Sequence, residues 1–194
     1  MYFLYKKWPK HKVIAQLLIF EATLNMSKEK IIILWFKRDL RLTDHEALFQ
    51  SVKFANKNNL RILPIFIFEP SLEEAEDTHP RHWKWILESL KEIIKTIPVT
   101  IFYDEAEAVF VELLKNYDFE RVYSHEETGN ALTYFRDKKI KQLFIKKNLS
   151  WKEYQQNGVI RGLQNRKSWD KSWVYYMTRP LKEISIRPSL FVNT

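Results

Sequence analysis

The sequence predicts an α/β fold, a five-stranded, doubly wound parallel sheet of Rossmann-like type with helices on both faces. Two observations lead to this prediction. Apolar runs rich in β-branched residues, which are typical of strands buried on both faces, alternate with stretches of helical periodicity. The connections between these segments are short, and such alternation is typical of a parallel sheet with crossover helices.

The first two strands are the clearest. Residues 31–36, IIILWF, predict the first buried strand, and residues 61–68, RILPIFIF, predict the second. Pro64 is an objection to the second strand, because proline cannot donate a hydrogen bond to a sheet ladder. Between the two strands, the spacing of Thr43 and Glu46 matches a capping box, which predicts that a helix starts there with Thr43 as its cap.

The middle of the chain continues the alternation. Pro80 suits the first turn of a helix, and apolar residues then recur at helical spacing as far as Ile97. Residues 99–104, VTIFYD, predict a third strand. The apolar spacing from Ala106 to Tyr117 predicts the next amphipathic helix.

Two further strands and one helix complete the predicted sheet domain. Residues 121–127, RVYSHEE, open with a short fourth strand, and residues 149–155, LSWKEYQ, predict the fifth. The helix between them is expected to place four apolar residues inward: Leu132, Phe135, Leu143 and Phe144. In such sheets, ligands bind outside the carboxyl ends of the strands, near the point where the strand order reverses.

Composition excludes several classes of site. The net charge of +8 favours an anionic partner, although lysines spread over helix faces give the same balance. The chain has no cysteine, which excludes disulfides and thiolate metal sites and fits a cytoplasmic protein. Its three glycines cannot form a GxGxxG or Walker A loop. No apolar run approaches the ~20 residues that span a bilayer, so we expect no membrane partner.

Residues 1–30 are expected to form an N-terminal extension. A basic start followed by VIAQLLIF is faintly similar to an export signal. Gln16 interrupts that stretch and Glu21 follows it, and no small-x-small cleavage motif accompanies it, so export is not favoured. Met1 and Met26 are both candidate starts of the protein.

A dense charged turn follows the first strand, where this fold class places its ligands. Lys37, Arg38 and Arg41 could contact an anionic or aromatic ligand. Alternatively, Asp39 pairs with a neighbouring arginine and locks the corner between strand and helix. From spacing alone, the locked corner is favoured.

Acidic residues follow the fourth strand in the same way. Glu126 and Glu127 could accept hydrogen bonds from the N–H groups of a bound heterocycle, or could simply be exposed. His125 beside them invites a metal hypothesis, but one His–Glu–Glu run lacks the other ligands that a metal centre needs, so we expect no metal site. No catalytic Ser–His–Asp order or GxSxG motif is present.

The segment after residue 156 interleaves arginine and lysine with aromatic residues. Such mixing can bind single strands or phosphate, although tryptophans at helical spacing more often pack against a neighbouring layer. If that layer is another domain, an aromatic patch would be exposed here. The residues concerned are Trp169, Trp173, Tyr175 and Tyr176.

These motifs together resemble the photolyase/cryptochrome family. The segment LWFKRDLRLTDHEAL (34–48) resembles the family's W-F-[RK]-x-D-L-R-L-x-D opening, and the match includes Trp35, Arg38, Asp39, Arg41 and Asp44. FIFEP (66–70), YSHEETGNALTYFRD with its Arg136–Asp137 pair, and WKEYQQNGVIRGL are also similar to family segments. The resemblance covers residues 31 to about 181 and is most specific at its start.

The resemblance implies a function in two parts. Family members carry an N-terminal α/β domain that often holds a folate or flavin-like antenna pigment. A helical domain follows, which holds FAD, binds DNA and either repairs lesions such as cyclobutane pyrimidine dimers or signals. By this resemblance, residues 31–156 are the α/β domain, and residues 157–194 hand over toward a helical FAD domain absent from this chain, as in a truncated or split protein.

The resemblance also implies a site and its partners. The antenna site would draw on Trp35, Arg38, Asp39, Arg41 and either Glu126 or Glu127. The chain alone is not expected to catalyse repair, and FAD is expected only in a full-length member. A separately encoded helical domain is the expected partner, with DNA bound through that domain or weakly through basic charge. The alternative is a free-standing module that binds a nucleotide-like ligand or DNA without catalysis.

Overall fold

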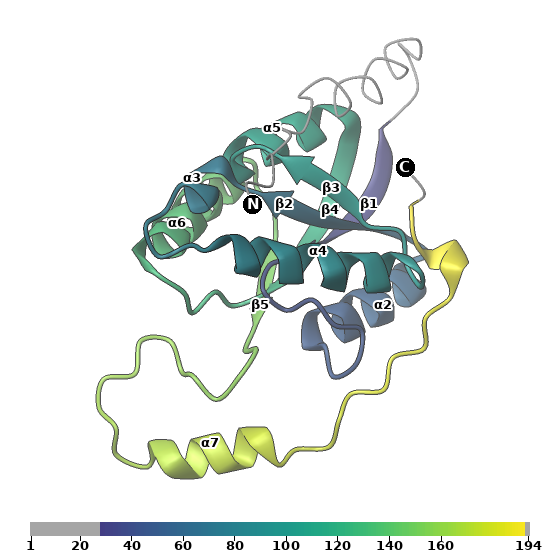
Figure 1. The fold of residues 1–194 in the computed structure, drawn as a ribbon. Coiled ribbons are helices and arrows are strands. Elements are labelled where there is room, and N and C mark those ends of the chain that lie inside the picture. Colours follow the sequence, from purple (N-terminus) through teal and green to yellow (C-terminus); the bar gives the residue numbers. More distant parts are fainter. Residues whose placement is uncertain (1–27, 193–194) are drawn as a thin grey trace.

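The computed structural model describes residues 28–192, so residues 1–27 of the expected extension, with both candidate starts, lie outside that range. The extension was predicted to reach residue 30, but Glu29 and Lys30 already belong to the first strand. Within residues 28–192, five parallel strands form one sheet in the order β3-β2-β1-β4-β5. This confirms the predicted fold class. Figure 1 shows the helices packed around this sheet, with α7 standing apart from it. No helix in this part of the chain is long and apolar enough to cross a bilayer.

The elements follow the predicted alternation closely. The strands are β1 (Glu29–Phe36), β2 (Arg61–Phe68), β3 (Thr100–Tyr103), β4 (Tyr117–His125) and β5 (Trp151–Tyr154). The main helices are α2 (Glu46–Asn58), α4 (Pro80–Ile94), α5 (Ala106–Asn116) and α6 (Ala131–Lys146). The short α3 (Pro70–Glu73), the outlying α7 (Trp169–Met177) and the 3-10 turn η2 (Pro188–Leu190) complete the set.

The strand β1 is buried on both faces and divides the core in two. Ile31, Ile33 and Trp35 pack with α5 and α6 on one face. Ile32, Leu34 and Phe36 pack with α2 and α4 on the other face. Continuous burial explains why the first strand has an unbroken apolar run instead of alternating polarity.

Pro64 is accommodated because of where its nitrogen lies. The isolated bridge between Ile62 and Phe191, and the bond from the Val192 N–H to the Ile62 carbonyl, place the C-terminal segment beside the first half of β2. Backbone groups alternate sides along a strand, so the nitrogen of Pro64 lies on the same side as that carbonyl. Pairing with β3 begins only at Ile65, so the missing donor falls where no β3 partner is paired.

The predicted cap of α2 was wrong. The helix begins at Glu46, and the cap is His45, whose Nδ1 accepts a hydrogen bond from the Leu48 N–H at 3.0 Å. Thr43 lies two residues further back, in the turn before the cap. The imidazole of His45 takes the place of the expected threonine hydroxyl as the cap acceptor, and its Nε2 contacts the Asp39 carboxylate on the other side of the ring.

The predicted inner face of α6 was partly wrong. Phe144 is buried and Leu143 is half-buried against the core, but Leu132 and Phe135 are exposed. Thr133 and Asp137 face inward instead. The helix is rotated so that its polar residues meet charges at the ends of β1 and β4, which a hydrophobic pattern cannot reveal.

The C-terminal segment returns to the sheet after leaving it. Residues 181–187 run past α2 with Ile184 and Ile186 half-buried against the core. Leu190, Phe191 and Val192 are then buried. The last part of the predicted handover segment therefore completes the core of this domain.

Candidate functional site

The strand order reverses between β1 and β4, because the chain builds β2 and β3 on one side of β1 and then β4 and β5 on the other. Ligands of doubly wound sheets bind outside the carboxyl ends of the strands at such a point. Arg38 and Asp39 follow β1, while Glu126 and Glu127 follow β4. The structure brings these candidates together: Arg38 Nε lies 3.4 Å from Glu127 Oε1.

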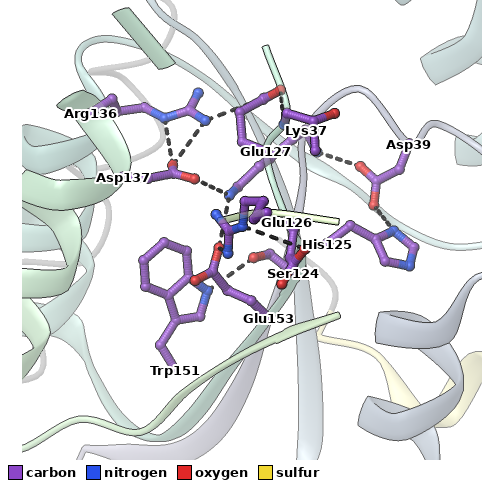
Figure 2. Close-up of polar contacts among 12 residues, drawn as sticks. Lys37, Asp39, Ser124, His125, Glu126, Glu127, Arg136, Asp137, Trp151 and Glu153 are labelled. Carbon is purple, nitrogen blue, oxygen red and sulfur yellow. Dashed lines mark hydrogen bonds and ion pairs between the residues drawn. The ribbon is translucent and has the colours of Figure 1, made fainter. Parts of the chain in front are cut away.

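Asp39 locks the turn after β1, but its partners are not arginines. Its Oδ1 accepts the Lys37 N–H at 2.7 Å. Its Oδ2 lies 2.6 Å from His125 Nδ1 and 2.8 Å from His45 Nε2 (Figure 2 shows the His125 contact). The locked corner is thus present, and the predicted Asp–Arg pairing is wrong because Arg41 turns to the backbone carbonyl of Asp44.

The contacts at this corner indicate the tautomer of His45 and shift the pKa values of Asp39 and His125. His45 Nδ1 accepts from Leu48, so its proton is on Nε2 and faces the carboxylate. Burial opposes ionisation of Asp39, but the two histidines outweigh it and hold the pKa of Asp39 well below its usual value. Burial lowers the pKa of His125, against the opposing hydrogen bond to Asp39, and favours its neutral form.

The same three residues could in principle ligate a metal ion, since one ligand atom from each lies within 4.8 Å of the others. Their spacing argues for protons instead. Two Zn–N or Zn–O bonds of about 2.0–2.1 Å at a tetrahedral angle would separate the donor atoms by roughly 3.3 Å. The observed separations of 2.6 and 2.8 Å are those of hydrogen bonds.

Lys37 lies between two tryptophans beneath the strand ends. Its Nζ is 4.6 Å from the Trp35 ring centre and 5.0 Å from that of Trp151. It also bonds Asp137 Oδ2 on α6 at 3.0 Å (Figure 2). Burial lowers the pKa of Lys37, with Asp137 opposing that shift. Lys37 therefore ties β1 to α6 and has no free access to a ligand.

Arg136 joins three acidic residues over the same strand ends. Its guanidinium lies 2.6 Å from Glu69, 3.0 Å from Asp137 and 3.4 Å from Glu127. Burial works against its charge, but Glu69 and Asp137 outweigh burial and raise the pKa of Arg136. The expected Arg–Asp pair of α6 is thus a structural clamp between the ends of β2 and β4.

Arg161 closes the other side of the cluster. Its guanidinium lies 2.9 Å from Glu153 and 3.4 Å from Glu126. Glu126 and Glu127 are therefore each neutralised by an arginine. Sequence reasoning identified the two glutamates but not these partners, which come from 9 and 35 residues further along the chain.

The DNA photolyase family model matches residues 32–173 of this chain. The chain belongs to the DNA photolyase family. Its sequence is 30% identical over 108 residues to the blue-light photoreceptor PHR2 of Arabidopsis thaliana, covering 50% of this chain and 23% of that protein. The chain thus spans about a quarter of that relative.

Solved photolyase-family structures share the fold. A Synechocystis cryptochrome superposes with a TM-score of 0.64 at 14% identity, over 87% of this chain and 42% of that one. A class III photolyase from Agrobacterium tumefaciens superposes with a TM-score of 0.59 at 20% identity, over 76% of this chain and 30% of that one. An archaeal photolyase from Sulfolobus tokodaii superposes with a TM-score of 0.62 at 22% identity, over 78% of this chain and 36% of that one. That structure is described with two FAD molecules and the implication of a novel light-harvesting cofactor.

The family resemblance named six cofactor-binding residues, and the structure divides them by access. Trp35 and Asp39 are each 1% exposed, so they would support a ligand site from behind. Glu126 and Glu127 form ion pairs with Arg161 and Arg136. Arg38 is exposed, and Arg41 lines a cleft, so these two have the best access to a ligand.

That cleft has a volume of ≈ 260 Å³ and lies where β1 and β5 end. Its lining residues are Arg41, Asp44, Gln156, Asn157, Tyr176, Met177, Arg179 and Leu181. Two guanidiniums, two side-chain amides and a phenol ring suit a planar heterocycle with carbonyl or acidic groups. Typical small-molecule sites are about 300–1,000 Å³, so this cleft suits one ring system with the remainder outside.

A larger hollow of ≈ 490 Å³ lies between α2 and residues 183–187. None of its lining residues lies in the segments that follow β1, β4 or β5. The smaller cleft is the one in the position where this fold class binds ligands.

Proposed function

We propose that this chain is the pigment-binding α/β domain of a light-dependent photolyase- or cryptochrome-type flavoprotein. Its ligand would be a folate- or flavin-like antenna seated in the strand-end cleft. The observation that supports this most directly is that Arg41, from the family's opening motif, lines a cleft at the carboxyl ends of β1 and β5. The pigment would supply light absorption and pass excitation energy to a second chromophore.

Three side chains of the cleft have a role in this proposal. Arg41 and Arg179 would donate to carbonyl, carboxylate or phosphate oxygens of the ligand, because a guanidinium presents several donors in one plane. Tyr176, held by its hydroxyl bond to the Gln155 carbonyl at 2.7 Å, would pack along the ring system. The Asp39 corner would fix the backbone that carries Arg41, so that the guanidinium is preorganised.

Repair or signalling would require a helical FAD-binding domain in addition to this one. The chain spans 23% of its Arabidopsis relative and 30–42% of the solved photolyase-family structures, so those activities are proposals for the whole assembly. We propose that such a domain, from the same protein or another chain, is the partner, and that the assembly works in the cytoplasm.

A titration tests the pigment proposal. Methenyltetrahydrofolate, FMN and FAD are added to the purified chain, and binding is followed by the change in pigment fluorescence anisotropy. At least one pigment should bind, and Arg41→Gln should weaken it about tenfold, since a charged hydrogen bond contributes about 1.5–3 kcal/mol.

The matched control is Arg61→Gln. Arg61 begins β2, at the opposite end of the strands, and pairs with Glu29 on the surface. It should leave pigment affinity unchanged, and thermal unfolding should show that both variants are folded. Absence of binding by all three pigments at millimolar concentration, or equal affinity of both variants, would refute the proposed site.

A further inference from the structure

The Asp39 corner, made of Asp39, His45 and His125, joins three separate parts of the fold. Asp39 lies in the turn after β1, His45 caps the start of α2, and His125 is the last residue of β4. Each of the three is at most 1% exposed, and Figure 2 shows the contact between Asp39 and His125. The described chain itself buries these groups, so an added domain would not expose them. The behaviour of the corner is therefore a property of this domain alone.

The contacts of the corner account for one proton on each imidazole ring. His45 carries its proton on Nε2, which lies 2.8 Å from Asp39 Oδ2, because its Nδ1 accepts from the Leu48 N–H. His125 turns its Nδ1 to the same carboxylate oxygen at 2.6 Å, so the proton of that ring faces an ionised acceptor. With these two protons and the backbone N–H of Lys37, the carboxylate is fully used.

A further proton has no good position while the corner is closed. On Nδ1 of His45 it would face the Leu48 N–H and break the cap of α2. On Nε2 of His125 it would lack an acceptor, because no hydrogen bond of that nitrogen is found within residues 28–192. The two rings also lie with their centres 4.2 Å apart, so a charged ring would press on its neighbour. A buried donor without an acceptor is costly, and the closed corner therefore opposes protonation.

The groups around His125 act mostly in the same direction. Burial lowers its pKa, the neighbouring His45 and Arg41 lower it further, and Asp39 alone opposes them. On β5 the residue paired with it is Tyr154, a phenol whose pKa is raised by burial and which adds no charge at neutral pH. In water none of these penalties applies. Acid therefore favours any state in which the ring of His125 has left the corner.

We propose that the Asp39 corner is a proton-sensitive latch, closed while His125 is neutral and open when acid protonates that ring and moves it toward water. Opening separates the end of β4 from the turn after β1 and leaves that turn held through His45 and the Lys37 N–H only. Histidine suits this role because its ordinary titration lies close to neutral pH. Arg41 is two residues from Asp39, so the latch sets how firmly its guanidinium is placed.

The effect of the latch on pigment rests on the proposed function. Arg41 lines the strand-end cleft, so a pigment that requires this guanidinium in place should bind the closed form. Its apparent affinity then falls in proportion to the closed fraction. One pH unit below the midpoint of opening, about one tenth of the chains are closed, so the affinity should be about tenfold lower. By reciprocity, bound pigment should keep the latch closed to lower pH.

The first test needs no pigment. The ¹⁵N-labelled chain is titrated from about pH 7.5 to 5.5, and NMR follows the ring nitrogens of His125 and the backbone amides of residues 37–41. Ring and amides should change together, with one midpoint below about pH 6.5, while far-ultraviolet circular dichroism shows that the domain is still folded. His125→Asn should abolish the change in the amides, because its amide group can donate to Asp39 but takes up no proton. The matched control is His82→Asn, an exposed histidine of α4, which should titrate as the wild type does.

Three outcomes of this titration would overturn the latch. The amides of residues 37–41 stay fixed while the His125 ring titrates, or the ring takes up no proton before the chain unfolds. In the third, the amide transition persists in His125→Asn. The first two are decided on the wild-type chain, so the proposal remains testable even if the variant does not fold.

The second test measures pigment affinity of the wild type and His125→Asn between the same pH limits. Comparison of the two chains at each pH removes the titration of the pigment itself. The wild type should lose affinity relative to the variant as pH falls, and an equal pH dependence would show that the latch does not control the cleft. Absence of pigment binding at every pH would refute the proposed pigment site, whereas the latch would still stand or fall on the NMR titration.

Discussion

Replacing Asp39 with asparagine should destabilise the domain severely, although the side chain barely changes in shape. The carboxylate accepts from the Lys37 N–H and faces proton-bearing nitrogens of His45 and His125. An amide oxygen can serve the backbone N–H, but the amide NH₂ then faces two imidazoles. His125 can change tautomer and accept. His45 cannot, because its Nδ1 already caps α2.

The magnitude follows from those contacts. Charge-assisted hydrogen bonds are worth about 1.5–3 kcal/mol each, and one buried donor left without an acceptor costs about 1–3 kcal/mol. Breaking a buried charged cluster by removing one partner typically costs about 3–5 kcal/mol, which we expect for Asp39→Asn at pH 7. That is a large part of the about 5–15 kcal/mol by which domains are stable.

The assay is urea unfolding followed by far-ultraviolet circular dichroism, with Asp44→Asn as the matched control. Asp44 lies in the same turn, is only half-buried and accepts one backbone bond, from Lys182 at 3.2 Å, so its variant should lose less than about 1 kcal/mol. Equal losses for the two variants would refute the assignment of Asp39 as the centre of the corner.

Acid provides a second check on the same residue. The pKa of folded Asp39 is held below its usual value, whereas the unfolded residue titrates at about 3.9. Its contribution to stability is therefore complete above about pH 3.9 and is lost as pH falls through the lower folded pKa. The difference between wild type and Asp39→Asn should shrink over that acid range. A constant difference would mean that the charge is irrelevant.

Three further predictions concern other parts of the fold. Burial lowers the folded pKa of His125, so the unfolded chain takes up the proton more readily. The free energy of unfolding should fall as pH drops below about 6.5, by at most about 1.4 kcal/mol per pH unit. In urea unfolding measured from pH 7 to 5, His125→Asn should reduce this dependence of stability on pH. Gly158→Ala should displace the Trp173 indole from its contact with residue 158 and so increase acrylamide quenching of tryptophan fluorescence. The stability of the sheet domain in urea should not change. Unchanged quenching would contradict the close packing. Phe191→Ala should cost about 3–5 kcal/mol in urea unfolding, whereas Phe135→Ala on the exposed face of α6 should cost under about 1 kcal/mol, and similar losses would contradict the burial of Phe191.

The sheet was predictable because its signal is local. The bounds of β2 were predicted as observed, since Ile62, Leu63 and residues 65–68 form a nearly continuous apolar run that begins after Arg61 and ends before Glu69. The start of β4 was missed because Tyr117 continues the helical spacing of α5, yet it already begins the strand. Such boundaries depend on which partner strand is near, and that information is not in the segment itself.

The site was predictable in position but not in chemistry. A charged turn after β1 and acidic residues after β4 had to meet once the strands were adjacent. The partners of Asp39 could not be read from spacing, because His45 and His125 are separated by 80 residues of sequence. The return of the C-terminal segment had one faint signal, the alternation of Ile184 and Ile186, which an extended strand against a core would show.

That return has a consequence for solubility. The strand β2 is twice as long as β3, so half of its outer edge would be open to strands of other molecules. Pro64 offers no donor there, and the backbone of Val192 occupies the carbonyl of Ile62. Phe191 and Val192 therefore act as a built-in cover against edge-to-edge aggregation. A chain that lost this cover would precipitate through β2 even while the rest of its sheet remained folded.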